Sequence, residues 1–137
     1  MILTLERVLL LKQVEMFAAV DDDVLAGLAA RMQEREGVPG EALLRQGEMG
    51  QELYVVVSGR VRVQRGEQTL AELGPRGVIG ELAALDPAPR TATVTVLEPT
   101  LLLSLDHADL AEELLSNSDL AWGIIRFLVR RFRDPTR

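Results

Sequence analysis

The sequence predicts a mainly β domain with helices at both ends, arranged as a barrel or a double-sheet roll. Between residues 34 and 105, glycine and proline divide the chain into many short segments rich in β-branched residues, which favours such a roll. On either side of this region, apolar residues recur at helical spacing. The length of 137 residues suits a single domain with one core. We therefore divide a single domain, 1–137, into N-terminal helices (1–33), a roll (34–105) and C-terminal helices (106–134).

The N-terminal region is predicted to hold two helices. Leu5, Val8, Leu9 and Lys12 have the spacing of one amphipathic helix. Asp21-Asp22-Asp23 then places negative charge where a second helix begins, and the helix dipole favours acidic residues there.

The strands of the roll are bounded by turn residues. Segments 53–57 and 61–63 flank Ser58-Gly59-Arg60, and this arrangement predicts a tight hairpin. Further strands are expected over 69–73, 92–97 and 100–105.

The C-terminal region is predicted to hold two helices. Asp106 is expected to cap the first of them, with His107 facing solvent, and Asp119 is expected to cap the second, over about 120–133. Asp134-Pro135 is expected to end it. This last helix is apolar around much of its circumference, more than docking on the roll requires, which favours a homodimer through it. The apolar residues in question are Leu120, Ile124, Phe127 and Leu128.

Composition excludes several classes of function. Fifteen Lys and Arg against 21 Asp and Glu give a net charge of −6, which argues against general binding to nucleic acid. The absence of cysteine excludes disulfides, thiolate metal sites and cysteine nucleophiles. A single histidine leaves no His cluster for a metal and disfavours a Ser-His-Asp triad, so no enzyme activity and no metal site are predicted. No apolar run reaches the length of a membrane span, and a cytoplasmic location is the expectation.

Residues 77–94 interrupt the strands and carry the most specific signal. Gly80 turns the chain into one helical turn over 81–85, and Arg90 returns it to a strand. Backbone N–H groups at the start of a helix can hold a phosphate, and a guanidinium offers a planar fork to its oxygens. Glu81 can accept a hydrogen bond from a hydroxyl on the same ligand. The segment suits a ligand with a phosphate and a free hydroxyl, although Glu81 could instead merely complement the helix and Arg90 merely pair with it.

These residues resemble a known motif. Gly80-Glu81-Leu82-Ala83, followed by Arg90-Thr91-Ala92-Thr93-Val94, is similar to the phosphate-binding cassette of cyclic nucleotide-binding domains. The flanks also match, since Gly47 with residues 53–61 is similar to a glycine-marked hairpin of that family and Phe17-Ala18-Ala19-Val20 is typical of its first helices. The resemblance covers nearly the whole chain. It implies an eight-stranded, jelly-roll-like β-roll that holds a 3′,5′-cyclic nucleotide, with N-terminal helices and two C-terminal helices.

The resemblance also implies residue roles. Arg90 would bind the cyclic phosphate and Glu81 the ribose 2′-hydroxyl. Thr91 would face the phosphate or the base, and its presence is compatible with cAMP, the favoured ligand, and with cGMP, the alternative. The backbone N–H groups of Leu82, Ala83 and Ala92 would hold phosphate oxygens.

The base cap is the least determined part of the implied site. The family draws it from the last helix or from outside the domain. Arg126, Phe127 and Arg130 are the candidates here, and the two arginines could equally be solvated charges.

The implied function is cyclic nucleotide sensing. Binding would shift a population toward a state in which the last helix closes over the roll and signals to a fused domain or a separate effector protein. The alternative is a nucleotide-free interaction module that keeps the fold. Transcription factors of the family carry a helix-turn-helix after this helix; only Pro135-Thr136-Arg137 follows here, so direct contact with nucleic acid is not expected.

Overall fold

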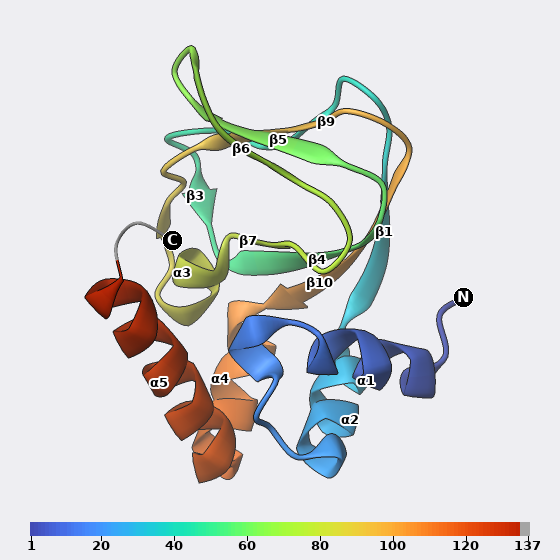
Figure 1. Cartoon of the computed structure of the whole chain (residues 1–137), viewed down its shortest axis with the longest axis vertical. Helices are drawn as coiled ribbons and strands as arrows, with labels where there is room; N and C mark the ends of the chain where they lie inside the picture. Colours follow the sequence, from blue (N-terminus) through green and yellow to red (C-terminus); the bar gives the residue numbers. More distant parts are fainter. Residues whose placement is uncertain (135–137) are drawn as a thin grey trace.

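Two four-stranded antiparallel sheets face each other and form the roll (Figure 1). The computed structural model describes residues 1–134. One sheet has the order β1 (Gln33–Gly37), β10 (Thr100–Asp106), β4 (Glu52–Ser58) and β7 (Val78–Ile79). The other has the order β2 (Ala42–Leu44), β9 (Thr93–Val96), β5 (Val61–Arg65) and β6 (Gln68–Leu73). These eight strands confirm the predicted roll, and a two-stranded sheet of β3 (Met49–Gly50) and β8 (Ala88–Pro89) adds to it.

The sheet of β10 and β4 is buried on both faces, which explains its continuous apolar runs. Val55 pairs with Leu103, and both pack on the helices; Val56 pairs with Leu102, and both face the interior of the roll. Because successive side chains of a strand point to opposite faces, a strand between two cores needs apolar residues at every position.

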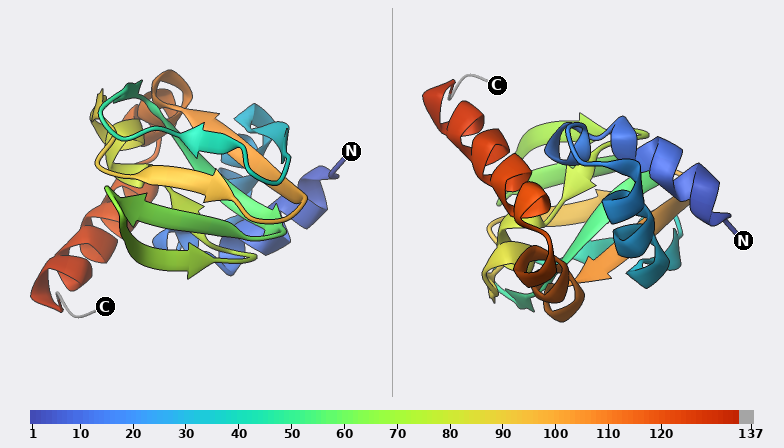
Figure 2. Two further views of the ribbon diagram at one scale, coloured as in Figure 1. Left: turned by 90° about the horizontal axis from the view of Figure 1, so that it is seen from above. Right: turned by 90° about the horizontal axis from the view of Figure 1, so that it is seen from below.

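The helices cover the outer face of this sheet (Figure 1). In chain order they are α1 (Thr4–Lys12), the 3₁₀ turn η1 (Glu15–Phe17), α2 (Asp22–Arg31), α4 (His107–Ser116) and α5 (Ser118–Arg133). Phe17 and Leu110 are fully buried where these helices meet the sheet. The short helix α3 (Glu81–Leu85) lies at the edge of the roll, between the strands and α5 (Figures 1 and 2).

The buried face of α1 differs from the predicted one. Leu5 and Leu9 are more than half exposed, whereas Val8 and Leu11 are buried. The difference follows from Arg7, which takes a place on the inner face. Its Nη1 donates hydrogen bonds to the carbonyls of Ala29 and Met32, at 2.9 and 2.7 Å, and so completes the C-terminal end of α2.

The predicted hairpin at 58–60 is wrong, because β4 and β5 belong to different sheets. Gly59 adopts φ 100°, and a Cβ there would lie 2.6 Å from the carbonyl oxygen of Pro99. The buried Thr100 hydroxyl accepts the N–H of Arg60 at 3.1 Å. These contacts bind the 58–60 segment to the start of β10, so the chain crosses between sheets. The hairpin of this region joins β5 to β6 through Gly66-Glu67.

Two details of the C-terminal helices also differ. Asp106 caps α4 as predicted, since its side chain accepts the N–H of Ala108 at 3.2 Å. His107 does not face solvent: it is half-buried, and its Nδ1–H donates to the carbonyl of Ala84 in α3 at 2.6 Å. Asp119 is not the cap of α5, because that helix already begins at Ser118, after Asn117. The helix ends at Arg133 and Asp134 follows it as predicted, while Pro135 lies outside the described residues.

Candidate functional site

The cassette folds around one glycine that no other residue could replace. Gly80 adopts φ 77° between β7 and α3, in the left-handed region that favours glycine. A Cβ at Gly80 would also lie 2.8 Å from the carbonyl oxygen of Glu52 and 2.5 Å from Nη1 of Arg90. The turn therefore brings the start of α3 against the guanidinium of Arg90.

Arg90 is held rigidly by its backbone. Its N–H donates to the carbonyl of Glu48 at 2.8 Å, and its carbonyl accepts the N–H of Gly47 at 2.9 Å. Its side chain passes over Gly50, where any Cβ would overlap Nε and Cζ of the arginine. The pairing of β3 with β8 and two close glycines thus build a slot for one side chain.

The guanidinium in this slot lacks a partner. Arg90 is only 8% exposed, and its Nη1 is the one buried side-chain polar atom within residues 1–134 that makes no hydrogen bond. None of the ion pairs within that part of the chain includes Arg90. A buried cation without a counter-charge is costly, and such a group calls for an anionic ligand.

Two cavities meet at this guanidinium. Gly80, Glu81, Arg90 and Thr91 line both of them. One, of about 460 Å³, opens between the cassette and Leu128 of α5. The other, of about 300 Å³, lies inside the roll and is lined by strand residues. Volumes of this size are typical of sites for small organic ligands.

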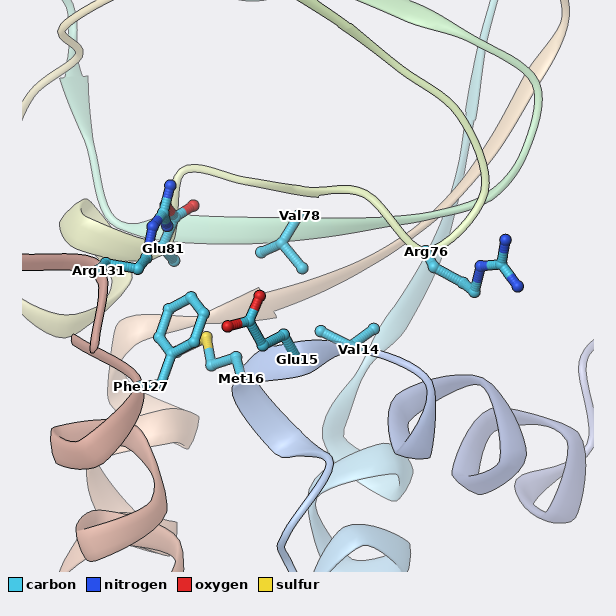
Figure 3. A pocket seen from close by; sticks show the side chains of 8 residues that line it. All are labelled: Val14, Glu15, Met16, Arg76, Val78, Glu81, Phe127 and Arg131. Carbon is cyan, nitrogen blue, oxygen red and sulfur yellow. The ribbon is translucent and has the colours of Figure 1, made fainter. Parts of the chain in front are cut away.

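Glu81 pairs with α5 and not with Arg90, so the interpretation in which these two cassette residues merely pair is wrong. Its Oε1 accepts a hydrogen bond from Nη1 of Arg131 at 3.0 Å (Figure 3). The Glu81 side chain is 16% exposed and that of Arg131 is 50% exposed. Glu81 therefore stays a hydrogen-bond acceptor at the edge of the cavities, and the positive charge of Arg90 stays uncompensated.

The remaining cassette residues supply a backbone surface. The first intrahelical bond of α3 runs from the N–H of Ala84 to the carbonyl of Gly80, at 3.2 Å. The N–H groups of Leu82 and Ala83 precede it and have no acceptor within the helix. Ala83 and Ala92 are buried and small, whereas Thr91 is exposed. Arg90 and the start of α3 can therefore approach one anion together.

The base-cap candidates lie away from both cavities. Phe127 is 6% exposed, and Figure 3 shows its ring beside Met16 of η1. Arg126 is exposed, with its guanidinium 5.9 Å from the centre of the Trp122 ring, and Arg130 is exposed as well.

The cavities are reached instead by Leu128 and Arg131, two residues of α5 that sequence reasoning did not assign to the site. Their i, i+3 spacing, which places them on one face of a helix, was the signal available in the sequence.

Comparison with known proteins decides the family. A sequence model described as the cyclic nucleotide-binding domain matches residues 34–117, more than half of the chain. The chain belongs to the cyclic nucleotide-binding domain family. The matched segment of this cyclic nucleotide-binding domain runs from β1 through the cassette to the end of α4.

Three similar proteins illustrate the family. A CRP-like cAMP-activated global transcriptional regulator of Mycobacterium tuberculosis is 29% identical over 129 residues, covering 90% of this chain and 58% of the relative. A cyclic AMP receptor protein of Thermus thermophilus is 37% identical over 100 residues, covering 69% of this chain and 46% of the relative. The crystal structure of the N-terminal domain of a transcriptional regulator from Streptomyces coelicolor superimposes with a TM-score of 0.84 at 39% identity, covering 92% of this chain and 94% of that one. The chain thus spans about half the length of the two sequence relatives.

Residues 1–134 contain neither a cluster of metal ligands nor a membrane-spanning helix. Among residues 1–134, no three His, Cys, Asp or Glu side chains gather into a group that could hold a metal ion. Within the same residues, no helix is long and apolar enough to cross a membrane.

Proposed function

We propose that this domain binds a 3′,5′-cyclic nucleotide at the cassette and acts as a sensor without catalytic activity of its own. The observation that carries the proposal is the buried guanidinium of Arg90, whose Nη1 lacks a hydrogen-bond partner. A cyclic phosphate supplies one negative charge and two exocyclic oxygens. Arg90 and the N–H groups of Leu82, Ala83 and Ala92 would share these oxygens. Glu81 would accept the ribose 2′-hydroxyl, and Thr91 would face the phosphate or the base.

The proposed ligand is cAMP, with cGMP as the alternative. The names of both sequence relatives refer to cAMP, which supports adenine as the base of the ligand. Thr91 lines both cavities and keeps a guanine contact open as the alternative.

A thermal-shift comparison of cAMP, cGMP and AMP tests binding and ligand choice together. We expect cAMP to raise the melting temperature most and AMP, whose phosphate is not cyclic, to raise it least. No shift with any of them at millimolar concentration would favour the nucleotide-free interaction module instead.

We propose that α5 transmits the signal that nucleotide is bound at the cassette. Leu128 and Arg131 reach the cavities, while Phe127, one residue before Leu128, packs against η1. A ligand at the cassette would therefore contact a helix that also touches the N-terminal elements. Hydrogen exchange along α5 tests this step: we expect slower exchange over 124–133 with saturating cAMP, and unchanged exchange would refute it.

We also propose a homodimer through α5, on a different face from that in the sequence prediction. Leu120, Ile124 and Phe127 are buried inside the chain itself. The apolar residues left exposed are spaced by three, four and three positions, which is the a/d pattern of a coiled coil. These residues are Trp122, Ile125, Val129 and Phe132. Figure 2 shows the C-terminal end of α5 extending past the roll in both views.

Sedimentation tests the dimer. We expect wild type to form dimers and Ile125→Asp to be monomeric. Leu115→Asp, at a residue of α4 that is 89% exposed, is the matched control and should not change the oligomeric state. A monomeric wild type with and without cAMP would contradict the proposal.

The regulated partner is proposed to be a fused domain or a separate effector protein reached through α5. Direct contact of this segment with nucleic acid is not part of the proposal, because its net charge of −6 disfavours a polyanion.

A further inference from the structure

The side chain of Glu81 has one partner among residues 1–134, and that partner lies on α5. Nη1 of Arg131 occupies Oε1 of Glu81 at 3.0 Å. A carboxylate offers about four acceptor positions on two oxygens, so Oε2 remains available to a ligand hydroxyl. Fifty residues separate the pair in sequence, and the contact exists only while the C-terminal half of α5 lies against α3.

Arg131 is itself held in place by an aromatic side chain of its own helix. Its guanidinium lies 5.3 Å from the centre of the Phe127 ring, and this ring packs beside Met16 of η1 (Figure 3). Phe127 is 6% exposed, so it provides a fixed platform. Cation–π contacts of this kind orient a guanidinium and add modest stability.

The ion pair stands between two cavities. Val78, Glu81 and Arg131 line the cavity inside the roll and also a cavity of about 330 Å³ beside η1 (Figure 3). The pair is thus part of the wall that separates the proposed ligand site from the N-terminal elements. Movement of α5 away from α3 would remove Arg131 from this wall and leave Glu81 free to rotate.

We infer that Arg131 is a positioning residue that holds Glu81 oriented for the ligand hydroxyl and so makes hydroxyl recognition depend on the docking of α5. The inference rests on the proposed function and adds to it a residue outside the cassette. The hydrogen bond from Arg131 to Oε1 fixes the rotamer of the Glu81 carboxylate, so the ligand hydroxyl must donate to Oε2. By linkage, a ligand with this hydroxyl favours docked α5 more strongly than a ligand without it.

The test is a thermodynamic cycle that combines substitution of Arg131 with removal of the 2′-hydroxyl from the ligand. Calorimetry measures the affinities of cAMP and 2′-deoxy-cAMP for wild type, Arg131→Met, Arg131→Lys and Arg133→Met. Methionine keeps an unbranched chain over Phe127 but removes the donors, and lysine restores one charged donor. Arg133→Met is the matched control: it makes the same change on the same helix at an exposed residue.

We expect wild type to bind 2′-deoxy-cAMP about tenfold or more weakly than cAMP. The ratio of the cAMP affinity to the 2′-deoxy-cAMP affinity should fall by about threefold in Arg131→Met, which is the scale of a half-exposed ion pair. In Arg131→Lys it should return toward the wild-type value. Arg133→Met should keep the wild-type ratio. An Arg131→Met protein that binds both ligands more weakly at an unchanged ratio would overturn the inference.

Failure of the proposed function looks different. A wild type that binds neither nucleotide would refute both the function and the inference. A wild type that binds both ligands equally would leave nucleotide binding in place and refute the role of the Glu81–Arg131 pair in hydroxyl recognition.

Discussion

Gly50→Ala is predicted to disable the anion site without touching any charged residue. Gly50 lies in β3 with a backbone that does not require glycine, since its φ is not in the left-handed region. A Cβ there would overlap Nε and Cζ of Arg90 and lie 2.6 Å from its Cδ. Carbon atoms normally pack about 3.5–4.0 Å apart, so the arginine side chain must move by about 1 Å.

A shift of this size takes the guanidinium out of hydrogen-bonding range of a phosphate. Each hydrogen bond to a charged group contributes about 1.5–3 kcal/mol, which corresponds to a loss of about tenfold to a hundredfold in affinity. Calorimetric titration of Gly50→Ala with cAMP measures this loss of affinity. Arg90→Ala added to Gly50→Ala should cost little more, because the two changes remove the same interaction.

Gly27→Ala is the matched control. Gly27 lies in α2, where a Cβ would make an ordinary contact of 3.7 Å with Oε1 of Glu113. We expect unchanged cAMP affinity and a gain in unfolding free energy of about 0.5–1 kcal/mol from the helix position. Wild-type affinity in folded Gly50→Ala would refute the reasoning that the slot around Arg90 admits only glycine.

Three further predictions concern stability. Leu103→Ala, at a fully buried residue, should lower the unfolding free energy by about 2–5 kcal/mol in urea denaturation, whereas Leu115→Ala, at a residue that is 89% exposed, should stay within about 0.5 kcal/mol. Burial raises the pKa of Tyr54 from 10.0. The contribution of Tyr54 to stability should therefore be present below pH 10 and be lost as pH rises through the raised pKa. Absorbance of this single tyrosine reports the titration. The hydrogen bond from the Val38 N–H lowers the pKa of Glu41 from 4.5. The contribution of Glu41 to stability should therefore be present above pH 4.5 and be lost as pH falls through the lowered pKa. Glu41→Gln should remove this effect from acid-unfolding curves.

The cassette was predictable from sequence because its chemistry is local. Gly80, a short helix and Arg90 follow one another within eleven residues, and each residue type has its own physical reason. The roll and the terminal helices were predictable from periodicity and turn residues. That prediction rests on the spacing of residues along the chain and does not depend on which distant segments pair.

The errors arose where distant segments meet. The turn at 58–60 has the sequence of a hairpin, and only its contact with Pro99 and Thr100 sends the chain into the other sheet. His107 has the sequence of a solvated first-turn residue, and only the carbonyl of Ala84 gives it a buried partner.

The two residues of α5 that reach the cavities were missed for the same reason. Leu128 and Arg131 are recognisable only when α5 is placed against α3. In sequence, the i, i+3 spacing of Leu128 and Arg131 shows that the two residues share a helix face, but it does not show that this face lies against α3.

The most direct test of anion binding by Arg90 is Arg90→Met, measured for both cAMP affinity and stability in the absence of nucleotide. Methionine keeps an unbranched chain between Gly50 and Gly80 but removes the buried charge that lacks a partner. Removing such a group should stabilise the nucleotide-free protein by about 1–3 kcal/mol, while cAMP affinity falls about thirtyfold or more. Arg62→Ala, in a strand of the roll away from the cassette, should change neither. Unchanged cAMP affinity in Arg90→Met, or a nucleotide-free protein that loses stability, would contradict the assignment of Arg90 as the anion-binding group.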